Sequence, residues 1–184
     1  MMPKLFPDDY VKSTYDIDFR ALYLEGYRAL LFDVDNTLVP HDAPADERAK
    51  ELFTMLHNEG FKCMFISNNS EPRVKTFCEA VGAFGYVFKA KKPKAFGYEE
   101  GMRRMSTDST NTLFFGDQIF TDIWGANNAG VRSILVKPIH KFREPGQIIL
   151  KRLLEAPVLL TYRLFGSLGR KKWRAPLKDG RVVF

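Results

Sequence analysis

Short apolar segments alternate with helical patterns along most of this sequence, and that alternation restricts the fold more than any other feature. The apolar segments have the length of buried strands, and the stretches between them carry apolar residues at helical spacing. The expected strands are 28–32, 61–67, 82–88, 112–116 and 131–136, and the expected helices are 16–25, 44–59, 70–82, 95–105 and 121–129. Strands that alternate with helices pair in parallel through right-handed crossovers. The sequence therefore predicts an α/β fold with a central parallel sheet between layers of helices.

Length and composition favour one globular domain over residues 1–184. Of the 184 residues, 45% are hydrophobic, which suffices for a substantial core. Cys63 and Cys78 lack the spacing of a zinc site and are expected to be reduced, packed thiols. The first nine residues contain no apolar signal segment, and no run of 18 apolar residues occurs. We therefore expect a cytoplasmic protein that is neither secreted nor membrane-spanning.

Positive charge is concentrated near the C-terminal end. The net charge is +6, yet residues 137–184 have 12 Lys and Arg against 3 Asp and Glu, while residues 1–136 have 16 against 19. We expect residues 138–184 to form a basic, amphipathic C-terminal extension. Its pattern predicts a helix at 147–155, a break at Pro157 and a second apolar piece at 158–168, followed by the basic run 170–174.

Two interpretations of this extension remain open. For the first helix, packing on the sheet and lying on a surface are both open, because one amphipathic face fits either place. For the second apolar piece and for the basic run, which contains Trp173, a surface that meets anionic headgroups is the favoured interpretation. A nucleic-acid patch would have a similar composition.

A carboxylate pair follows the first expected strand. Asp33 and Asp35 stand two residues apart, so in an extended chain they point to the same face. Two ionised carboxylates repel unless one is protonated or a cation lies between them. A calcium loop is excluded, because Leu38 stands where glycine is needed and Pro44 where a bidentate glutamate is needed.

Further polar residues follow the other expected strands, at the edge where parallel α/β sheets bind ligands. Ser67 and Asn68 precede a helix, where they could hold a phosphate or merely cap the helix. Lys92 lies in a basic turn that is either solvated or aimed at the site. Asp117 and Asp122 follow the fourth strand, and Asp33 with Asp117 could supply oxygen ligands for Mg²⁺. His41, His57 and His140 have no metal-ligand spacing and are expected to be surface or packed residues.

Together these motifs resemble the haloacid dehalogenase (HAD) superfamily of phosphatases. In order, they are Asp33-x-Asp35-x-Thr37, Ser67, Lys92-Pro93 and Gly116-Asp117-x-x-x-x-Asp122, over about residues 28–137. The strings around the first three are most similar to the YqeG-like, class III branch, whose organellar relatives are phosphatidylglycerophosphate phosphatases. Val34 departs from the lysine expected in the organellar enzymes. The resemblance implies a three-layer HAD-like (Rossmannoid) fold.

The resemblance also implies a Mg²⁺-dependent phosphomonoesterase that forms an aspartyl-phosphate. Asp33 would attack phosphorus, and Asp35 would serve as general acid and base. The phosphate oxygens would be held by Thr37, Ser67, Asn68 and Lys92. The ligands of Mg²⁺ would be Asp33, Asp117 and the backbone carbonyl of Asp35, while Asp122 would orient Lys92 or a metal-bound water.

The short spacing between motifs leaves no room for a cap domain. Only 29 residues separate Thr37 from Ser67, and 24 separate Ser67 from Lys92. An open site suits a phosphate on something too large to enclose, so the expected substrate is phosphatidylglycerophosphate at the inner face of the membrane, with an anionic membrane surface as partner. The alternatives are a phosphatase of nucleic-acid ends or phosphoproteins, and an RNA- or ribosome-associated protein with a vestigial site. No partner protein is predicted.

Overall fold

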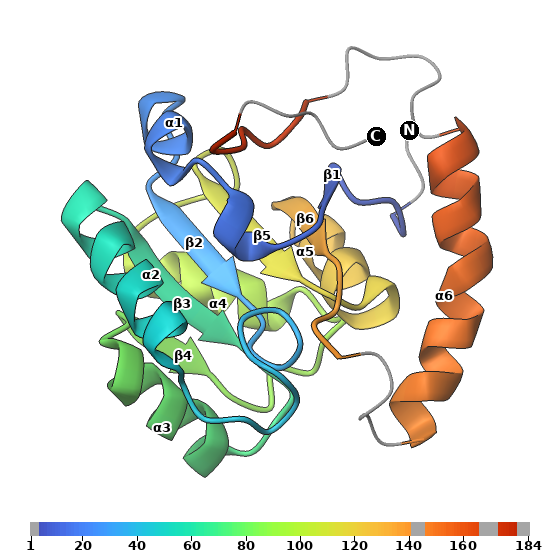
Figure 1. Ribbon diagram of the computed structural model, residues 1–184, viewed down its shortest axis with the longest axis horizontal. Coiled ribbons are helices and arrows are strands. Elements are labelled where there is room, and N and C mark those ends of the chain that lie inside the picture. Colours follow the sequence, from blue (N-terminus) through green and yellow to red (C-terminus); the bar gives the residue numbers. More distant parts are fainter. Residues whose placement is uncertain (1–3, 141–145, 166–172, 180–184) are drawn as a thin grey trace.

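The computed structural model describes residues 4–140, 146–165 and 173–179 and contains a six-stranded parallel sheet (Figure 1). The elements are β1 (Asp9–Val11), η1 (Thr14–Asp16), α1 (Phe19–Leu24), β2 (Ala29–Phe32), α2 (Glu47–Glu59), β3 (Lys62–Ile66), α3 (Glu71–Val81), β4 (Gly85–Val87), α4 (Phe96–Met105), β5 (Thr112–Gly116), η2 (Ile119–Ile123), α5 (Trp124–Asn128), β6 (Arg132–Val136) and α6 (Gly146–Phe165). The strand order is β1-β6-β5-β2-β3-β4. The predicted parallel α/β sheet is confirmed.

Helices cover both faces of the sheet, because successive strand residues point to opposite faces. One apolar cluster joins one face of the central strands to α1, α2 and α3, and includes Phe32, Phe65 and Phe115. The other cluster joins the opposite face to α4 and α5, and includes Leu31 and Phe114. The result is the expected three-layer fold, with β2 and β5 buried along their whole length.

Local signals at the helix ends explain where two of these helices begin and end. The Asp46 carboxylate accepts a hydrogen bond from the backbone N–H of Ala49 at 2.8 Å and caps the start of α2. Gly60 ends the same helix with φ of 95°, a left-handed conformation that glycine adopts without strain. Gly82 ends α3 in the same way. These short helices return the chain so that each strand starts at the same edge of the sheet.

The register of the central strands brings their carboxyl ends together. Phe32 of β2 pairs with Phe65 of β3 on one side and with Phe115 of β5 on the other. The residues that follow these three strands therefore emerge side by side. The intervals between the motifs contain only α2 with β3, and α3 with β4, within residues that the structure describes throughout, so the expected absence of a cap there is confirmed.

The structure differs from the expected elements at both ends of this core. The N-terminal strand β1 was not expected, because it has three residues and is defined only by pairing with β6, more than a hundred residues later. The expected helix 16–25 is split into η1 and α1 by Ile17 and the N-cap residue Asp18. The expected helix 121–129 is a π-helical turn, η2, that continues as the short α5.

The prediction that Pro157 breaks the C-terminal helix is wrong. A single helix, α6, runs through this proline from Gly146 to Phe165. Proline removes the N–H bond to the carbonyl of residue 153, but Leu153 and Pro157 both lie on the exposed side of the helix, where water can replace that bond. Of the second apolar piece, residues 166–168 lie outside the described residues, as do residues 170–172 of the basic run.

The described end of the basic run packs on the N-terminal region. Arg174 forms an ion pair with Asp9 at 2.9 Å, and the Trp173 ring packs edge-on against Tyr27. Leu177 forms an antiparallel bridge with Ile17. Long-range contacts that no local pattern encodes thus hold Trp173 and Arg174 on the domain, where both remain partly exposed. That the basic run meets anionic headgroups stays a prediction. Cys63 and Cys78 are both buried, unpaired thiols, as expected.

Candidate active site

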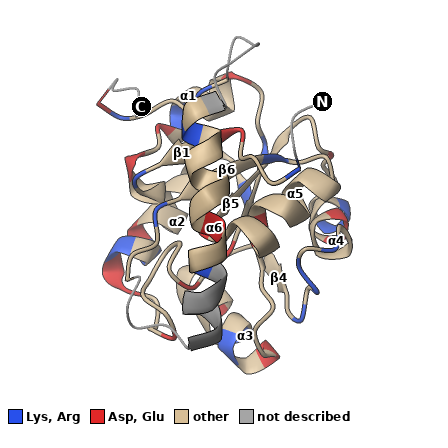
Figure 2. Cartoon of the chain, turned by 90° about the vertical axis from the view of Figure 1, so that its right-hand side faces the viewer, with Lys and Arg blue, Asp and Glu red and all other residues tan. Residues whose placement is uncertain are grey.

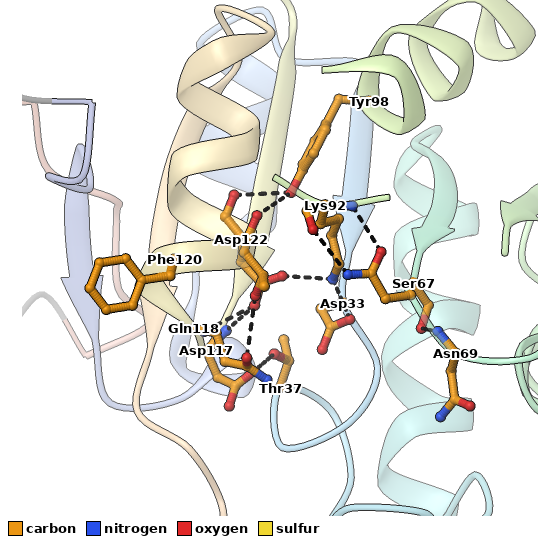
Figure 3. Close-up of polar contacts among 12 residues, drawn as sticks. Asp33, Thr37, Ser67, Asn69, Lys92, Tyr98, Asp117, Gln118, Phe120 and Asp122 are labelled. Carbon is orange, nitrogen blue, oxygen red and sulfur yellow. Dashed lines mark hydrogen bonds and ion pairs between the residues drawn. The ribbon is translucent and has the colours of Figure 1, made fainter. Parts of the chain in front are cut away.

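Asp33 lies directly after β2 and is the centre of a buried polar cluster (Figure 3). Its carboxylate accepts a hydrogen bond from the Lys92 ammonium at 2.6 Å. The backbone N–H of Asp33 donates to the carbonyl of Phe115, so the sheet ladder continues one residue past the strand and holds the carboxylate in place. A carboxylate so held, at the carboxyl edge of a parallel sheet, is well placed to act on a ligand.

Lys92 bridges two carboxylates. Its ammonium contacts Asp33 and Asp122, each at 2.6 Å, and only 4% of its side chain is exposed. The Asn68 side chain fixes the backbone of this lysine, because its Nδ2 donates to the Lys92 carbonyl at 3.1 Å and its Oδ1 accepts from the Lys92 N–H at 2.8 Å. The lysine is therefore aimed at the site from a turn that is itself held in place.

Asp122 links Lys92 to the loop after β5. Its Oδ1 accepts from Lys92, and its Oδ2 accepts from the backbone N–H groups of Asp117 and Gln118, at 3.1 and 3.0 Å. Gly116 makes this approach possible, since a Cβ there would lie 2.6 Å from the Cβ of Asp122. Behind it, the Tyr98 hydroxyl donates to the Asp122 carbonyl at 3.0 Å.

Asp117 is fully buried next to Asp33 and Asp122. One oxygen from each of these three carboxylates lies within 4.8 Å of the others. The Thr37 hydroxyl lies 3.5 Å from Asp117 Oδ1, so it faces this carboxylate. On its other side, Asp117 forms an ion pair with Arg152 of α6. This contact brings the C-terminal helix to the site.

Asp35 has partners of its own. Arg73 of α3 donates to its Oδ1 at 2.8 Å, and the backbone N–H of Asp42 donates to the same oxygen at 2.9 Å. The Asn69 side chain donates to Oδ2 at 3.3 Å. Asp33 and Asp35 therefore follow the same strand but contact different cations, Lys92 and Arg73.

A cavity of about 290 Å³ opens between these groups. Its lining includes Asp33, Asp35, Asn36, His41, Ser67, Asn68, Asn69, Lys92, Gln118 and Thr121. Ser67 Oγ accepts from the backbone N–H of Asn69 at 3.1 Å, and Ser70 stands at the N-cap of α3 without a capping side-chain bond. The cavity thus has acid, hydroxyl, amide and ammonium groups around one space, a composition that suits an anionic ligand.

Burial and neighbouring charges together raise the pKa of three groups in this cluster. Burial raises the pKa of Asp33 to about 7, although the Lys92 ammonium lowers it. Burial and the charge of Asp122 raise the pKa of Asp117 well above its ordinary value, while Arg152 lowers it. Burial lowers the pKa of Lys92, but the carboxylates of Asp122 and Asp33 outweigh it and raise the pKa overall. The lysine stays charged, whereas the carboxylates need further positive charge.

The donor set fits a divalent metal ion. Three buried carboxylates, those of Asp33, Asp117 and Asp122, face the two cations Lys92 and Arg152. Hard cations such as Mg²⁺ prefer oxygen ligands, and a bound cation would compensate the remaining negative charge. In a second group, Asp35, His41 and Asp42, the possible ligand atoms also lie within 4.8 Å of one another. This group is more exposed, and its Asp35 already forms an ion pair with Arg73.

Sequence reasoning missed three residues around this site. Arg73 lies in the first turn of α3, four residues after Asn69, and donates to Asp35. Its place shortly after the end of β3 could have marked it as a site residue. Arg152 has no local signal, because it lies 35 positions after Asp117 in the chain. His41 was expected to be a surface or packed residue, yet it lines the cavity and lies 3.4 Å from the Asp42 carboxylate.

Two family models match the chain over the motifs that meet in this cluster. The model described as a haloacid dehalogenase-like hydrolase matches residues 30–96, and the one described as HAD-hydrolase-like matches residues 89–138. The Bacillus subtilis (strain 168) protein named Probable phosphatase YqeG is 36% identical over 141 residues, which are 76% of this chain and 81% of that protein. The chain belongs to the HAD-like hydrolases.

Within this family the chain is a YqeG-like HAD phosphatase. It is also related to phosphatidylglycerophosphate phosphatases. The Arabidopsis thaliana chloroplastic and mitochondrial enzyme of that name is 27% identical over 171 residues, or 84% of this chain and 47% of that protein. The Chlamydomonas reinhardtii chloroplastic enzyme is 26% identical over 159 residues, or 82% and 59%. The HAD phosphatase described here thus spans about half the length of these two relatives.

Solved structures support the HAD fold alone. An uncharacterised protein of Listeria monocytogenes serotype 4b superposes with a TM-score of 0.51 at 17% identity, over 68% of this HAD phosphatase and 99% of that chain. A candidate β-phosphoglucomutase from Thermotoga maritima gives a TM-score of 0.50 at 12% identity, over 67% and 91%.

Proposed function

We propose that this HAD phosphatase hydrolyses phosphomonoesters through an aspartyl-phosphate on Asp33, with Mg²⁺ as its cofactor. The observation that carries the proposal is the geometry of Asp33, a buried carboxylate held 2.6 Å from Lys92 at the end of a central strand, beside Asp117. Such a carboxylate can act as a nucleophile towards phosphorus, and the lysine compensates the charge of an incoming phosphate.

The reaction has two displacements. First, an oxygen of Asp33 forms a bond to phosphorus while the bond to the leaving oxygen breaks, and Asp35 gives that oxygen its proton. Then water attacks phosphorus, Asp35 accepts a proton from the water, and the bond from phosphorus to Asp33 breaks. Arg73 and Asn69 hold the Asp35 carboxylate, which supports a positioned acid and base separate from the nucleophile.

The metal ligands in this proposal are Asp33, Asp117 and the backbone carbonyl of Asp35. When bound there, Mg²⁺ would spread the negative charge of the transferring phosphoryl group. For Asp122 we favour the role of orienting Lys92, because both of its oxygens already accept hydrogen bonds from the protein. The phosphate oxygens would contact Thr37, Ser67, the Asn68 backbone and Lys92. The Thr37 hydroxyl faces Asp117, so this phosphate-binding group would lie beside one of the proposed metal ligands.

The proposed substrate is phosphatidylglycerophosphate. Two of the relatives described above carry the name phosphatidylglycerophosphate phosphatase, and the open, capless site suits a phosphate on a bilayer. The corresponding partner would be an anionic membrane surface at the inner face of the cytoplasmic membrane. Among the described residues, no helix combines the length and apolar character needed to cross a bilayer.

A phosphate-release screen tests this proposal. The wild-type protein would be incubated with phosphatidylglycerophosphate in detergent, a 5′-phosphorylated oligonucleotide, a phosphopeptide and a small phosphoester, each with Mg²⁺ and with EDTA. We expect release from the lipid and the small ester, and none with EDTA. Preferential hydrolysis of the oligonucleotide or the peptide would contradict the lipid as substrate. Phosphate release in the presence of EDTA would contradict the requirement for Mg²⁺.

A further inference from the structure

The outer face of α6 is apolar and exposed. Leu153, Leu160 and Leu164 follow one another at helical spacing, with 66%, 58% and 59% of each residue exposed, and Leu154 is 59% exposed. Figure 2 looks onto this helix, and most of its described length is tan, so it consists mainly of residues other than Lys, Arg, Asp and Glu. We call this surface the α6 outer face; the exposed residues of the helix are Leu153, Leu154, Ala156, Pro157, Leu160, Thr161, Arg163 and Leu164.

Different residues attach α6 to the domain. Val158 and Leu159 pack on an apolar cluster with Ile119 and Ile123, while the Tyr162 ring packs edge-on against Phe6. Glu155 accepts a hydrogen bond from the backbone N–H of Phe120 at 3.2 Å. The exposed leucines are therefore not needed to hold the helix. A surface helix normally presents polar residues on the side away from the core. An apolar outer face therefore indicates a surface that binds a partner or a membrane.

The charges of α6 suit an anionic bilayer as that contact. The one acidic residue among the described side chains of α6 is Glu155, and it is buried on the inner face. Arg163 is an exposed cation of the same helix, and residues 137–184 as a whole carry an excess of nine positive charges. A helix with leucines on one side and no exposed carboxylate can lie flat in the boundary between headgroups and acyl chains.

The same helix reaches the active site. Its Arg152 contacts Asp117, and its N-terminal half lies near the carboxyl edge of the sheet (Figure 1). A helix is about 10 Å across, so a bilayer in contact with the α6 outer face would lie about one helix diameter from the site.

We propose that the α6 outer face is the surface through which this phosphatase docks on an anionic lipid bilayer. The inference rests on the proposed function, because the lipid phosphate to be hydrolysed lies in that bilayer. It differs from a general attraction of basic residues to membranes, because it assigns the contact to leucines of one helix.

Vesicle sedimentation tests whether the α6 outer face binds an anionic bilayer. The probes are vesicles of phosphatidylcholine alone and of phosphatidylcholine with phosphatidylglycerol. The variant Leu153→Gln/Leu160→Gln/Leu164→Gln removes the apolar contact without disturbing the packed face, and Leu24→Gln is the matched control, since Leu24 is 79% exposed on α1. We expect wild type and control to bind the anionic vesicles, and the triple variant to bind them roughly 100-fold more weakly.

A fluorescent reporter keeps the proposal testable if the triple variant misfolds. Tryptophan in Leu160→Trp should shift its emission to the blue when anionic vesicles are added, whereas tryptophan in Leu24→Trp should not. Equal shifts at both positions, or no shift at Leu160→Trp, would overturn the proposal. So would a triple variant that binds vesicles like wild type but changes from dimer to monomer, because the occupant of the face would then be a second copy.

Enzyme assays separate this inference from the proposed function. The triple variant should hydrolyse a small phosphoester and detergent-dispersed phosphatidylglycerophosphate at wild-type rates, and should lose at least tenfold only on the vesicle-borne lipid. Wild-type protein that hydrolyses the lipid in detergent but ignores vesicles would overturn the docking surface alone. Vesicle binding through the leucines without hydrolysis of the lipid would support the surface and overturn the substrate.

Discussion

Arg152 of α6 donates to both the carboxylate and the backbone carbonyl of Asp117, the second at 3.3 Å. The contact joins the C-terminal helix to a buried residue at the end of a central strand. It places a fixed positive charge next to a carboxylate that we assign to the metal. The guanidinium and a divalent ion would therefore both act on Asp117.

Arg152→Gln should strengthen Mg²⁺ binding. A cation and a divalent ion about 5 Å apart repel by about 1–2 kcal/mol even in a water-like medium, so removing the guanidinium should increase the affinity roughly tenfold. Isothermal titration calorimetry would measure this. Arg163→Gln, on the same helix but away from the site, should leave the affinity unchanged. Weaker binding in Arg152→Gln would mean that the guanidinium instead orients Asp117 for the metal.

Asp33→Asn should abolish turnover while the fold persists, because an amide cannot form the aspartyl-phosphate. Beryllofluoride, which mimics a phosphoryl group on aspartate, should bind the wild type only with Mg²⁺ and should not bind the variant. Phosphate release and circular dichroism would measure the two effects. Activity within tenfold of wild type would contradict the role of Asp33 as nucleophile.

Asp35 and Asp117 should respond differently to the same substitution. Asp35→Asn should lower kcat by at least about 100-fold with little change in Mg²⁺ affinity, because the side chain acts through a proton. Asp117→Asn should raise the Mg²⁺ concentration needed for half-maximal activity, because it removes a charged ligand. Activity measured against Mg²⁺ concentration distinguishes them. The same Mg²⁺ dependence in both variants would show that the roles are misassigned.

Glu155 should make the attachment of α6 depend on pH. Burial raises its pKa from 4.5 to about 7 in the folded protein, against the Phe120 N–H and Arg152, which lower it. Because the folded state binds the proton more tightly than the unfolded state, stability contributed by this group is present below about pH 4.5 and is lost as pH rises to about 7. Glu155→Gln, which can still accept from Phe120, should therefore stabilise the protein by about 1–2 kcal/mol at pH 8 and hardly at pH 5.

Thermal unfolding of wild type and Glu155→Gln between pH 5 and pH 8 would measure this difference. Hydrogen exchange at the α6 amides should follow the same pH dependence, since the carboxylate lies between α6 and η2. An equal effect of the substitution at both pH values would show that Glu155 is ionised throughout the range.

Gly116→Ala should disturb the site through Asp122. The added Cβ would lie 2.6 Å from the Asp122 side chain, a distance that requires the carboxylate to move away from Lys92. We expect a loss of about 2 kcal/mol in stability and a large loss of kcat. Gly85→Ala is the control, because its Cβ would meet only the flexible Met64 side chain at 3.3 Å. Unchanged activity in Gly116→Ala would mean that Asp122 is not needed to position the lysine.

Sequence patterns were sufficient for the central strands and the helices between them. The segment 112–116 was expected as a strand and is β5 with the same bounds. A short, continuous apolar run between turn residues is typical of a buried strand. The chain also indicated which polar residues follow strand ends. It could not indicate η2, whose π-helical turn depends on how Asp122 returns to the N–H groups of Asp117 and Gln118.

The sequence by itself determined the parallel core and the order of the motifs, because strand and helix periodicity and the residues after each strand are local properties of the chain. Only the tertiary structure decided which charges meet. Arg73 with Asp35, Arg152 with Asp117, and the passage of α6 through Pro157 all depend on contacts between segments far apart in the chain or on which side of a helix faces water. Periodicity determines which face of an element is apolar, whereas the partner of a charged side chain is set by the packing of the whole domain.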